Sequence, residues 1–357
     1  DVRSAHEQVR RKPPPVVSAV VTGAGRALPA TYEQSAVWRD YFAPRYDGVR
    51  AAERVFMAAG VRTRHAVVYP GDEDLSSAGT ETRMLRYLAE AMPLGKQAVA
   101  GALDAAGLAP GDVGLFAVAS CTGYVTPGLD IRLANDLGMP ADLQRLLVGH
   151  MGCYAALPGL GAVGDYVTAQ SRPAVLLCLE LTSLHVQPAV PELEQVVNHS
   201  LFSDAAAAVV VEPGARRGRR VAATVARTDY ATADHMTWDV TDLGFRMGLS
   251  PRVPDVLSRH VGGVVDELLT GAGLRVEDVA GWAVHPGGPR ILDVVRDQLG
   301  LAEEQLGASR RVLAEHGNCS SATVLLVLEE LADVDGPVVA MAFGPGLTLY
   351  ATLLLPA

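Results

Sequence analysis

The sequence predicts an α/β protein made of two similar halves. Short apolar runs of the length of strands buried on both faces alternate with helical patterns. These runs are residues 115–119, 174–181 and 205–211. Residues 103–118 and 269–284 are identical at eight of sixteen positions, and the same offset of 166 residues places Cys153 on Cys319. A register held across two separate segments favours a duplication over a chance likeness of alanine-rich helices. We therefore expect two halves about a pseudo-twofold axis, each a mixed sheet covered by helices.

Composition restricts the class of protein. Apolar residues make up 49% and charged residues 20% of the 357 residues, which indicates a globular chain. A net charge of −10 would repel phosphate and argues against nucleic-acid binding. The four cysteines form no CxxC pair, which argues against a zinc ribbon, a dithiol redox site or a disulfide framework and favours a reducing cytosol. No apolar stretch has the length of a membrane helix. Residues 1–15 lack the apolar core of a signal peptide and are expected to form a flexible arm.

The elements of the first half follow from apolar and helical patterns. Residues 16–22 are expected as a buried strand, followed by a turn at Gly23–Gly25. Residues 32–59 and 82–106 have helical patterns, and Gly107 is placed to cap the second helix. The remaining segments are expected as a basic turn at 61–65 and a polar loop at 72–82.

A break in composition separates the two expected halves. Residues 214–220 are rich in Gly and Arg and are expected as a solvated linker, after which a strand at 221–226 opens the second half. The predicted domains are therefore an N-terminal half at 16–212 and a C-terminal half at 221–357.

Cys153 is the first candidate for catalysis. It follows a glycine and opens a run of small residues compatible with a helix. At the first turn of a helix its sulfur would meet unpaired backbone N–H groups and the positive end of the helix dipole, which favour the nucleophilic thiolate. The alternative is a small buried hydrophobe, as most free cysteines are. Functional groups of α/β sheets collect at strand ends and helix starts, so polar groups of the other half could face this thiol.

Two residues of the second half could act with this thiol. His285 ends an apolar strand, and the Pro–Gly–Gly sequence after it forces a turn that lets a ligand come close. A histidine in that place could activate a cysteine. Asn318 occupies a helix N-cap position, where its amide could stabilise an oxyanion. A merely structural histidine and simple N-capping remain the alternatives.

Other motifs lack the context that their chemistry needs. Gly159–Gly164 matches GxGxxG, but the residues before it belong to the expected Cys153 helix, so we interpret it as helix packing. Gly23–Gly25 follows a strand but has Leu28 in place of a third glycine, which disfavours an oxidoreductase. The absence of GxSxG, HExxH and GxxxxGK[ST] disfavours hydrolases, metalloproteases and NTPases of those types. A catalytically silent protein that keeps the fold remains a further alternative.

Seven segments together carry a resemblance to a known family. They are Cys121–Asp130, Gly149–Ala155, Glu180–Ser183, Leu201–Ala206, His285–Gly288, Gly317–Ser321 and Phe343–Gly346. With Cys, His and Asn in this order, the chain resembles the type III polyketide synthases of the chalcone synthase superfamily, from about Val16 to the C-terminus. It is most similar to bacterial, alkylpyrone-forming members.

The resemblance implies a thiolase-like fold with duplicated halves in five layers, α-β-α-β-α. Cys153 would carry an acyl chain as a thioester. His285 and Asn318 would bind the thioester carbonyl of malonyl-CoA and stabilise the enolate left by decarboxylation. The implied activity is that of an acyltransferase, a type III polyketide synthase that loads an acyl-CoA starter, extends it with malonyl-CoA and cyclises it to a pyrone or resorcinol-type product. The alternative is a β-ketoacyl-acyl-carrier-protein synthase III, which condenses once and releases a linear product.

The resemblance also implies residues that contact the substrates. Phe202 matches the gatekeeping phenylalanine between the coenzyme A tunnel and the cavity, and Phe245 matches a second such residue, although the loop after it, 250–254, is longer than in plant members. Further implied cavity residues are Cys121, Thr122, Thr182, His185, Ser320, Gly344, Pro345 and Gly346. The implied coenzyme A contacts are Arg62, Arg64, Gly287 and Gly288.

The same resemblance sets the expected partners. Acyl-CoA and malonyl-CoA are the expected substrates, and a second copy of the chain is the expected partner in a homodimer. No cofactor, metal ion, nucleic acid or membrane is expected, and the expected location is the cytoplasm.

Overall fold

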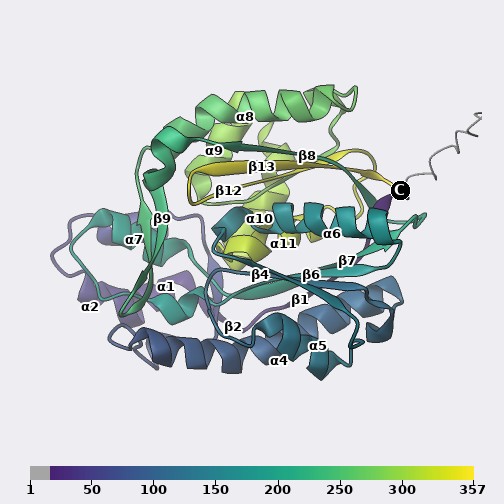
Figure 1. The fold of residues 1–357 in the computed structure, drawn as a ribbon. Helices are drawn as coiled ribbons and strands as arrows, with labels where there is room; N and C mark the ends of the chain where they lie inside the picture. The colour runs from purple at the N-terminus through teal and green to yellow at the C-terminus, as the bar shows by residue number, and fades with distance from the viewer. Residues whose placement is uncertain (1–16) are drawn as a thin grey trace, which may run out of the picture.

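The computed structural model describes residues 17–357, and its helices and strands lie in five layers (Figure 1). The nine main strands are hydrogen-bonded in the order β11-β12-β13-β8-β1-β7-β6-β4-β5. The expected arm at residues 1–15 lies outside the described residues. Within residues 17–357, no helix is both long enough and apolar enough to cross a membrane.

The first half supplies five of these strands. They are β1 (Ala19–Ala27), β4 (Leu115–Ser120), β5 (Gln144–Gly149), β6 (Ala174–Glu180) and β7 (Ala205–Pro213). β4 is parallel to β5 and β6, whereas β7 is antiparallel to both β6 and β1. Helices α4 (Thr80–Ala106) and α5 (Leu129–Leu137) cover one face, and α6 (Ala156–Gln170) lies on the other, between the two sheets (Figure 1).

The second half repeats this arrangement. Its strands are β8 (Arg219–Thr228), β11 (Gly281–Val284), β12 (Val338–Gly344) and β13 (Thr348–Pro356). β12 is parallel to β11 and antiparallel to β13, which is antiparallel to β8, so the directions repeat those of β6, β4, β7 and β1. Helices α8 (Val253–Thr270) and α9 (Pro289–Leu299) form the outer layer, and α10 (Gly307–His316) and α11 (Thr323–Glu330) share the central layer with α6 (Figure 1). The predicted duplicated α/β fold is thereby confirmed.

The short helical turns repeat as well. η2 (Pro110–Asp112) precedes β4 and η6 (Val276–Asp278) precedes β11, while η3 (Gly152–Tyr154) leads into α6 and η8 (Ser320–Ala322) leads into α11. The two sheets join where β1 meets β8 through only two residue pairs, Val20 with Arg220 and Val21 with Arg219. The offset of 166 residues seen in the sequence therefore corresponds to a repeated unit of structure.

Most predicted strands are confirmed, but β1 differs from its prediction. The runs at 115–119, 174–181, 205–211 and 221–226 lie in β4, β6, β7 and β8, with residue 181 just beyond β6. The turn predicted at Gly23–Gly25 is instead part of β1, with a register shift between Val21 and Gly23. A Cβ on Gly25 would lie 2.3 Å from the backbone of α4. The glycines are there because strand and helix touch, not because the chain turns.

The helix predicted at 32–59 is also wrong. The chain forms β2 (Ala30–Glu33), α1 (Gln34–Val37), the π-helical η1 (Trp38–Phe42), α2 (Ala43–Arg45) and α3 (Ala52–Met57). Gly48 and Ala51 have positive φ angles of 82° and 69°, which no helix accommodates. The aromatic rings of Trp38, Phe42 and Phe56 pack together and hold the short pieces in place. Local helix propensity thus yields to tertiary packing.

The shorter segments show smaller differences. The turn predicted at 61–65 is mostly strand β3 (Thr63–Ala66), which pairs with β2. The loop predicted at 72–82 ends earlier, because α4 begins at Thr80. As predicted, Gly107 caps this helix, and it has the left-handed conformation. The linker predicted at 214–220 is shorter, because Arg219 already lies in β8 and donates to the carbonyls of Leu331, Val334 and Gly336.

Most of the remaining elements lie at one end of the layers. They are η4 (Thr182–His185), α7 (Leu193–Leu201), η5 (Tyr230–His235), β9 (Met236–Thr241) and β10 (Gly244–Leu249). In contrast, η7 (Glu303–Leu306) packs on α9, α10 and β11. β9 and β10 form an antiparallel hairpin. This hairpin, α7, α1 and η1 contribute residues to the lining of the cavities described next.

Candidate active site

Cys153 lies where the two halves meet. It sits in η3 at the start of α6 and is 5% exposed. The preceding Gly152 has φ +75°, and a Cβ there would lie 2.7 Å from the ring of Pro345. Gly344, at the end of β12, is also close, because a Cβ on it would be 3.2 Å from the backbone nitrogen of Cys153. Two glycines therefore let the loop of the second half rest directly on the cysteine.

The side chain of Asn318 faces this thiol from the second half. The Cys153 Sγ lies 4.0 Å from Asn318 Oδ1, and the same oxygen accepts a 2.9 Å hydrogen bond from the Ser320 backbone N–H. The backbone of Asn318 is held by Leu201 and Ser203 in a parallel bridge centred on Phe202. The amide is thus fixed beside the sulfur, and it also caps the turn after it.

His285 lies at the end of β11, beside β12, and is 1% exposed. Its backbone N–H donates to the Met341 carbonyl at 2.7 Å. Within the described residues, neither ring nitrogen has a hydrogen-bond partner, although both are buried. Burial lowers the pKa of His285 to about 3, so the imidazole is neutral at pH 7. An unpartnered buried polar group is costly and marks a place where a ligand can bind.

The state of the thiol differs from the sequence-based expectation. Burial raises the pKa of Cys153 to about 12, and the nearby Glu180 adds to this increase. Hydrogen bonds with Ser320 and Asn318 act in the opposite direction but are weaker. The expectation that the helix start alone favours a thiolate is therefore wrong, because desolvation outweighs the backbone N–H groups. Ionisation of Cys153 needs a proton acceptor in the site.

The carboxylate of Glu180 connects residues of the site through hydrogen bonds. Glu180 ends β6, is fully buried, and accepts hydrogen bonds from the Cys121 N–H, the Thr122 hydroxyl and the Ser321 hydroxyl at 3.0, 2.8 and 2.6 Å. Burial raises the pKa of its carboxyl group, whereas these hydrogen bonds lower it. Sequence reasoning noted Glu180 only as part of a motif. The signal that could have singled it out is a carboxylate at the end of an otherwise wholly apolar strand.

Cys153 lines one cavity, and a larger cavity lies next to it. The smaller one, of about 290 Å³, is lined by Cys153 together with six of the residues expected in the cavity. These six are Cys121, Thr122, Thr182, Phe202, Ser320 and Pro345. The larger cavity, of about 880 Å³, opens toward solvent and is lined in part by His185 and Phe245. Gly344 contacts Cys153 and Tyr154, while Gly346 donates its N–H to Met236.

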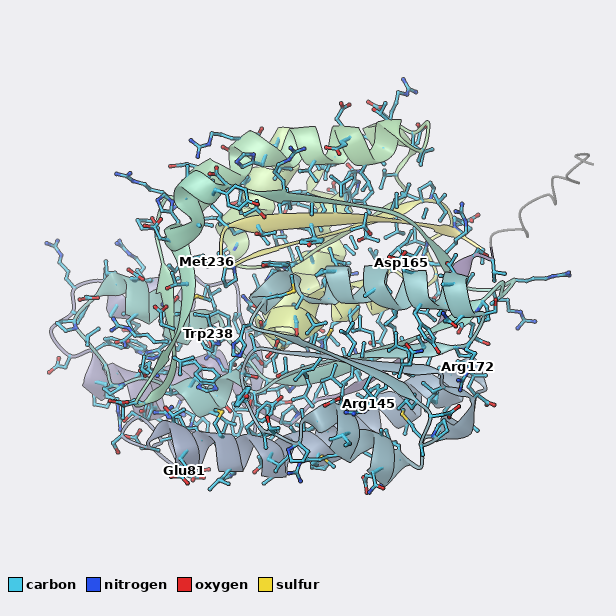
Figure 2. All side chains as sticks on the ribbon, in the orientation of Figure 1. Glu81, Arg145, Asp165, Arg172, Met236 and Trp238 are labelled. Atoms are coloured by element: carbon cyan, nitrogen blue, oxygen red, sulfur yellow. The ribbon has the colours of Figure 1, made fainter. Side chains whose placement is uncertain are left out.

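Trp238 stands between the two cavities, and sequence reasoning missed it. Of the residues that the structure describes, four line both cavities: Thr182, Phe202, Trp238 and Met247. The indole Nε1–H of Trp238 donates to the Cys121 carbonyl at 2.7 Å. Figure 2 marks Trp238 on the β9 strand, at the end of the molecule where the hairpin lies. No sequence signal distinguishes this tryptophan from a core residue, because its place depends on how the hairpin folds back over the site.

His185 and Phe245 form one wall of the larger cavity. Nδ1 of His185 accepts the Phe245 N–H at 2.9 Å, so Nε2 carries the proton and donates to the Thr122 carbonyl at 2.5 Å. The imidazole stacks on the Phe245 ring with centroids 4.6 Å apart. Burial lowers the pKa of His185 to about 4. Both nitrogens are used inside the protein, so His185 shapes the wall and holds Phe245.

The residues expected at coenzyme A have different surroundings. Arg64 is buried, and its guanidinium donates to Gln34 and to carbonyls of His199, Ser200 and Phe202 at the C-terminal end of α7. Its donors are used within the fold. Arg62 is exposed and lies 3.2 Å from Glu315. Gly287 and Gly288 form the turn before α9, with Gly287 half-buried and Gly288 buried.

The other motifs of the sequence lie in structural positions. The segment Gly159–Gly164 lies inside α6, as expected, where Gly159 packs on Leu176. In the part of the chain that the structure describes, no three side chains of His, Cys, Asp or Glu group together so that they could hold a metal ion.

Comparison with known proteins identifies the family. Residues 18–215 match the N-terminal domain of the chalcone and stilbene synthases, and residues 224–356 match their C-terminal domain. A 1,3,6,8-tetrahydroxynaphthalene synthase of Streptomyces peucetius subsp. caesius is 39% identical over 317 residues, which cover 84% of this chain and 82% of the relative. An alpha-pyrone synthesis polyketide synthase-like protein of Mycobacterium tuberculosis is 31% identical over 369 aligned positions, covering 95% and 92% of the two chains.

Solved structures of polyketide synthases have the same fold as this chain. The polyketide synthase PKS-I of the brown alga Ectocarpus siliculosus has a TM-score of 0.90 at 27% identity, covering 97% of this chain and all of its own. The 1,3,6,8-tetrahydroxynaphthalene synthase of Streptomyces coelicolor has a TM-score of 0.88 at 28% identity, covering 94% and 99%. The chain belongs to the chalcone and stilbene synthase family and is a type III polyketide synthase, an enzyme of the acyltransferase class with a thiolase-like fold.

Proposed function

We propose that this type III polyketide synthase loads an acyl-CoA starter on Cys153, extends it with malonyl-CoA and cyclises the product to a pyrone or resorcinol-type ring. In this proposal the N-terminal half, 16–212, carries the nucleophile and the C-terminal half, 221–357, carries His285 and Asn318. The observation that carries the proposal is the thiol of one half facing the amide of the other, with an unpartnered buried imidazole at a neighbouring strand end.

The loading step needs a proton acceptor, because burial holds the pKa of Cys153 high. In our proposal the neutral imidazole of His285 takes the thiol proton while Sγ attacks the thioester carbonyl of the starter. The carbon–sulfur bond to coenzyme A breaks, coenzyme A leaves with a proton, and the acyl group remains on Cys153. A thiolate suits this step because it is nucleophilic and also leaves readily.

The extension step needs donors for a developing oxyanion. When malonyl-CoA loses carbon dioxide, the electron pair of the broken bond becomes an enolate, whose oxygen would accept hydrogen bonds from Asn318 and His285. The enolate carbon then attacks the acyl-Cys153 carbonyl and displaces the thiolate. Asn318 cannot titrate, and its Oδ1 is already occupied by the Ser320 N–H, which turns Nδ2 away from that contact.

We propose that the two cavities have different roles in the reaction. The smaller one holds the reacting thiol, and the larger one would accept the starter chain or the folded polyketide before ring closure. For coenzyme A we propose contacts with the exposed Arg62 and the Gly287–Gly288 turn, and no cofactor beyond the thioester substrates. Relatives named for tetrahydroxynaphthalene and alpha-pyrone products show that the ring formed varies between similar chains.

We further propose a cytoplasmic homodimer that pairs through the edge of the sheet at β5. β5 is the last strand of the sheet, and most of its residues are exposed. Leu146 and Leu147 on β5 and Tyr124 nearby in sequence to β4 are large exposed apolar side chains. Such an edge invites pairing with a second copy.

The test is a product assay with malonyl-CoA and acyl-CoA starters from acetyl to palmitoyl, read by mass spectrometry. We expect cyclised triketides or tetraketides that Cys153→Ala does not make. A single linear condensation product, enhanced by an acyl carrier protein, would replace our proposal with a synthase III reaction. No product from any starter, with folded protein, would also contradict it.

A further inference from the structure

The amide of Asn318 is fixed by a neighbouring segment of chain. Its backbone N–H donates to the Leu201 carbonyl at 2.8 Å, and its carbonyl accepts the Ser203 N–H at 3.0 Å. Gly317 lets the two segments approach, because a Cβ there would lie 2.8 Å from Ser203 Cβ. The place of Asn318 therefore depends on what holds these two segments in register.

His65 contacts both segments. Its backbone N–H donates to the Ser203 hydroxyl at 2.7 Å, and its carbonyl accepts the Asp204 N–H at 3.0 Å. Its ring Nε2 lies 2.9 Å from Nδ1 of His316, only two residues before Asn318. The two imidazoles are nearly stacked, with centroids 5.1 Å apart. One residue of β3 thus joins the segment that carries Phe202 to the segment that carries Asn318.

The surroundings of Nδ1 of His65 favour one direction of this hydrogen bond. Nδ1 lies 3.2 Å from the Pro29 carbonyl, which can only accept, and 3.1 Å from the Thr31 hydroxyl, which can donate or accept. A proton on Nδ1 gives the carbonyl a donor, whereas an unprotonated Nδ1 would leave it facing a lone pair. With the proton on Nδ1, Nε2 of the neutral ring accepts from Nδ1 of His316. The pKa of His65 is lowered to about 4 by burial, and that of His316 is lowered too. Arg26 acts in the same direction on both rings, while Glu315 and Glu330 oppose it at His316.

We propose that the His65–His316 pair, joined by this ring-to-ring hydrogen bond, is a positioning device that sets the place of the Asn318 amide beside Cys153. The proposal rests on the proposed role of Asn318 in malonyl-CoA decarboxylation. Neither histidine touches the reacting atoms. Both act through the bridge between Asn318 and the Phe202 segment.

A positioning role and a purely structural role predict different effects on starter loading and on decarboxylation. Starter loading uses Cys153, whereas decarboxylation also needs the Asn318 amide at the developing enolate oxygen. If the pair positions Asn318, its loss slows decarboxylation and spares loading. If it only supports the fold, both partial reactions fall together with stability.

The experiment measures the two partial reactions separately in the full-length protein. Loading is followed as the rate of acyl-Cys153 formation from an acyl-CoA starter by intact-protein mass spectrometry. Decarboxylation is followed as conversion of malonyl-CoA to acetyl-CoA and carbon dioxide without a starter. The variants are His316→Leu and His65→Leu, with His260→Leu as the matched control because His260 pairs with Asp229, which belongs to neither of the two segments.

We expect His316→Leu to slow decarboxylation by about ten- to a hundredfold, the cost of a donor displaced by a fraction of an ångström, with loading within about twofold of the unmodified protein. His316→Asn places an amide near the position of Nδ1 and should restore most of the rate, as should His65→Gln, whose side chain can accept near the position of Nε2. Unchanged decarboxylation in His316→Leu, or equal losses in both reactions, would overturn the proposal.

Two further outcomes are informative. If His65→Leu does not fold, the half-buried His316 decides the question by itself. If the unmodified protein neither loads nor decarboxylates, the proposed function fails and this inference fails with it. Activity in the unmodified protein with parallel losses in the variants removes only the positioning role.

Discussion

The two halves share one architecture but contribute different side chains to the site. At the offset of 166 residues, Cys153 corresponds to Cys319, Gly152 to Asn318 and Ala119 to His285. Cys153 lines a cavity, whereas Cys319 is fully buried and its Sγ lies 3.3 Å from the His316 carbonyl. The thiol of the first half is therefore accessible from a cavity, whereas the equivalent thiol of the second half is not exposed.

Close packing maintains this difference. Position 152 cannot carry an amide, because its φ is +75° and a Cβ would meet Pro345 at 2.7 Å. At the equivalent place in the second half, Asn318 fits beside Phe202 because Gly317 takes the positive φ instead. In the proposed reaction, the duplicated frame therefore takes the nucleophile from one half and its hydrogen-bond donors from the other.

The strongest test of this comparison replaces each of the two cysteines with alanine in turn. Cys153→Ala should lower product formation by at least about a thousandfold, because the proposed attachment point of the acyl chain is removed. Cys319→Ala should leave the rate within about threefold, with a loss of about 1 kcal/mol in the free energy of unfolding from the small cavity. Product formation by mass spectrometry and unfolding in urea measure the two effects.

Reagent mapping gives an independent readout of the same pair. Iodoacetamide should alkylate Cys153 before Cys319, and an acyl-CoA starter should protect Cys153 only. Faster labelling of Cys319 would contradict the difference in access on which the comparison depends.

The sequence predicted the frame of the site better than its details. Strands buried on both faces, the repeat at 103–118 and 269–284, and the Cys, His and Asn positions are all visible as local patterns. The strands and the site positions depend on residues adjacent in the chain, and the repeat depends on comparing two such stretches. The helix predicted at 32–59 failed because aromatic packing and residues with positive φ divide it, which periodicity does not reveal.

What the sequence could not predict comes from contacts between distant segments. Trp238 reaches the Cys121 carbonyl only because the β9–β10 hairpin folds over the cavities. His65 meets His316 across 251 positions of sequence. The pKa of Cys153 depends on desolvation by both halves, so the helix start alone gave the wrong direction. Such long-range pairs leave no periodic signal.

A second test concerns His285, which stands where the first half has Ala119. Because burial lowers its pKa to about 3, the unfolded chain binds a proton below about pH 6.5 that the folded chain does not bind until lower pH. Stability therefore falls as the pH falls through this window. For one such histidine the loss between pH 7 and pH 5 is on the order of 2 kcal/mol.

His285→Leu should remove that part of the acid sensitivity. At pH 7 it should not be less stable than the unmodified protein, because it replaces a buried ring with two unpartnered nitrogens by an apolar side chain of similar size. Urea unfolding at both pH values measures this. An identical pH dependence in the variant would show that the ring is not buried as a neutral imidazole.

A third test compares the two cavities. Trp238→Ala should join the space around Cys153 to the larger cavity and shift the preferred starter toward longer chains, by about tenfold in the ratio of long-chain to short-chain products. Trp238→Phe keeps most of the bulk but loses the bond to Cys121, so it should change the ratio less. Val240→Ala, exposed on the same strand, is the control. An unchanged product profile for Trp238→Ala would mean that this side chain does not separate the cavities.

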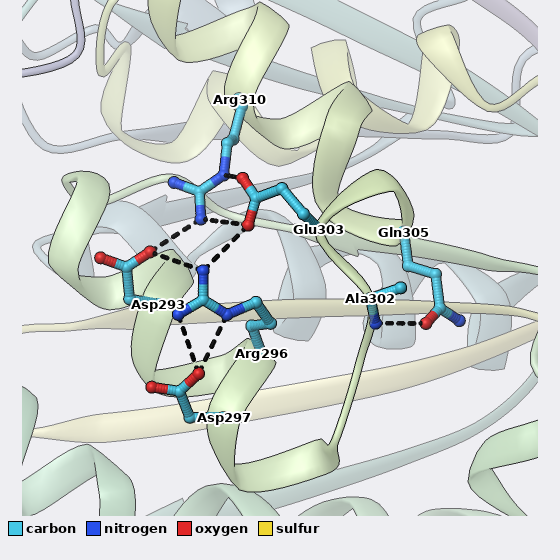
Figure 3. Close-up of polar contacts among 7 residues, drawn as sticks. All are labelled: Asp293, Arg296, Asp297, Ala302, Glu303, Gln305 and Arg310. Carbon is cyan, nitrogen blue, oxygen red and sulfur yellow. Dashed lines mark hydrogen bonds and ion pairs between the residues drawn. The ribbon is translucent and has the colours of Figure 1, made fainter.

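The smallest expected effect, on thermal stability, concerns a stretch of chain that forms a strand in one half and a helix in the other. The first half ends its sheet with the exposed strand β5, whereas the second half has α10 in the corresponding stretch of chain, after α9. Figure 3 shows how Arg296 and Arg310 join these helices through Asp293 and Glu303, with Arg310–Asp293 and Arg296–Glu303 contacts of 2.8 and 2.9 Å. These groups are partly exposed, so each contact stabilises the fold only weakly.

Glu303→Gln should therefore lower Tm by about 2 °C or less at low salt and by still less at high salt, with product formation unchanged. Gln305→Ala, a neighbour that accepts only the Ala302 N–H, is the control without charge. A salt-dependent loss of activity in Glu303→Gln would mean that the corner formed by α9 and α10 also positions the site, since α9 follows the His285 turn and α10 ends at His316. The second half would then depend on surface charge for a geometry that the first half keeps by glycine packing alone.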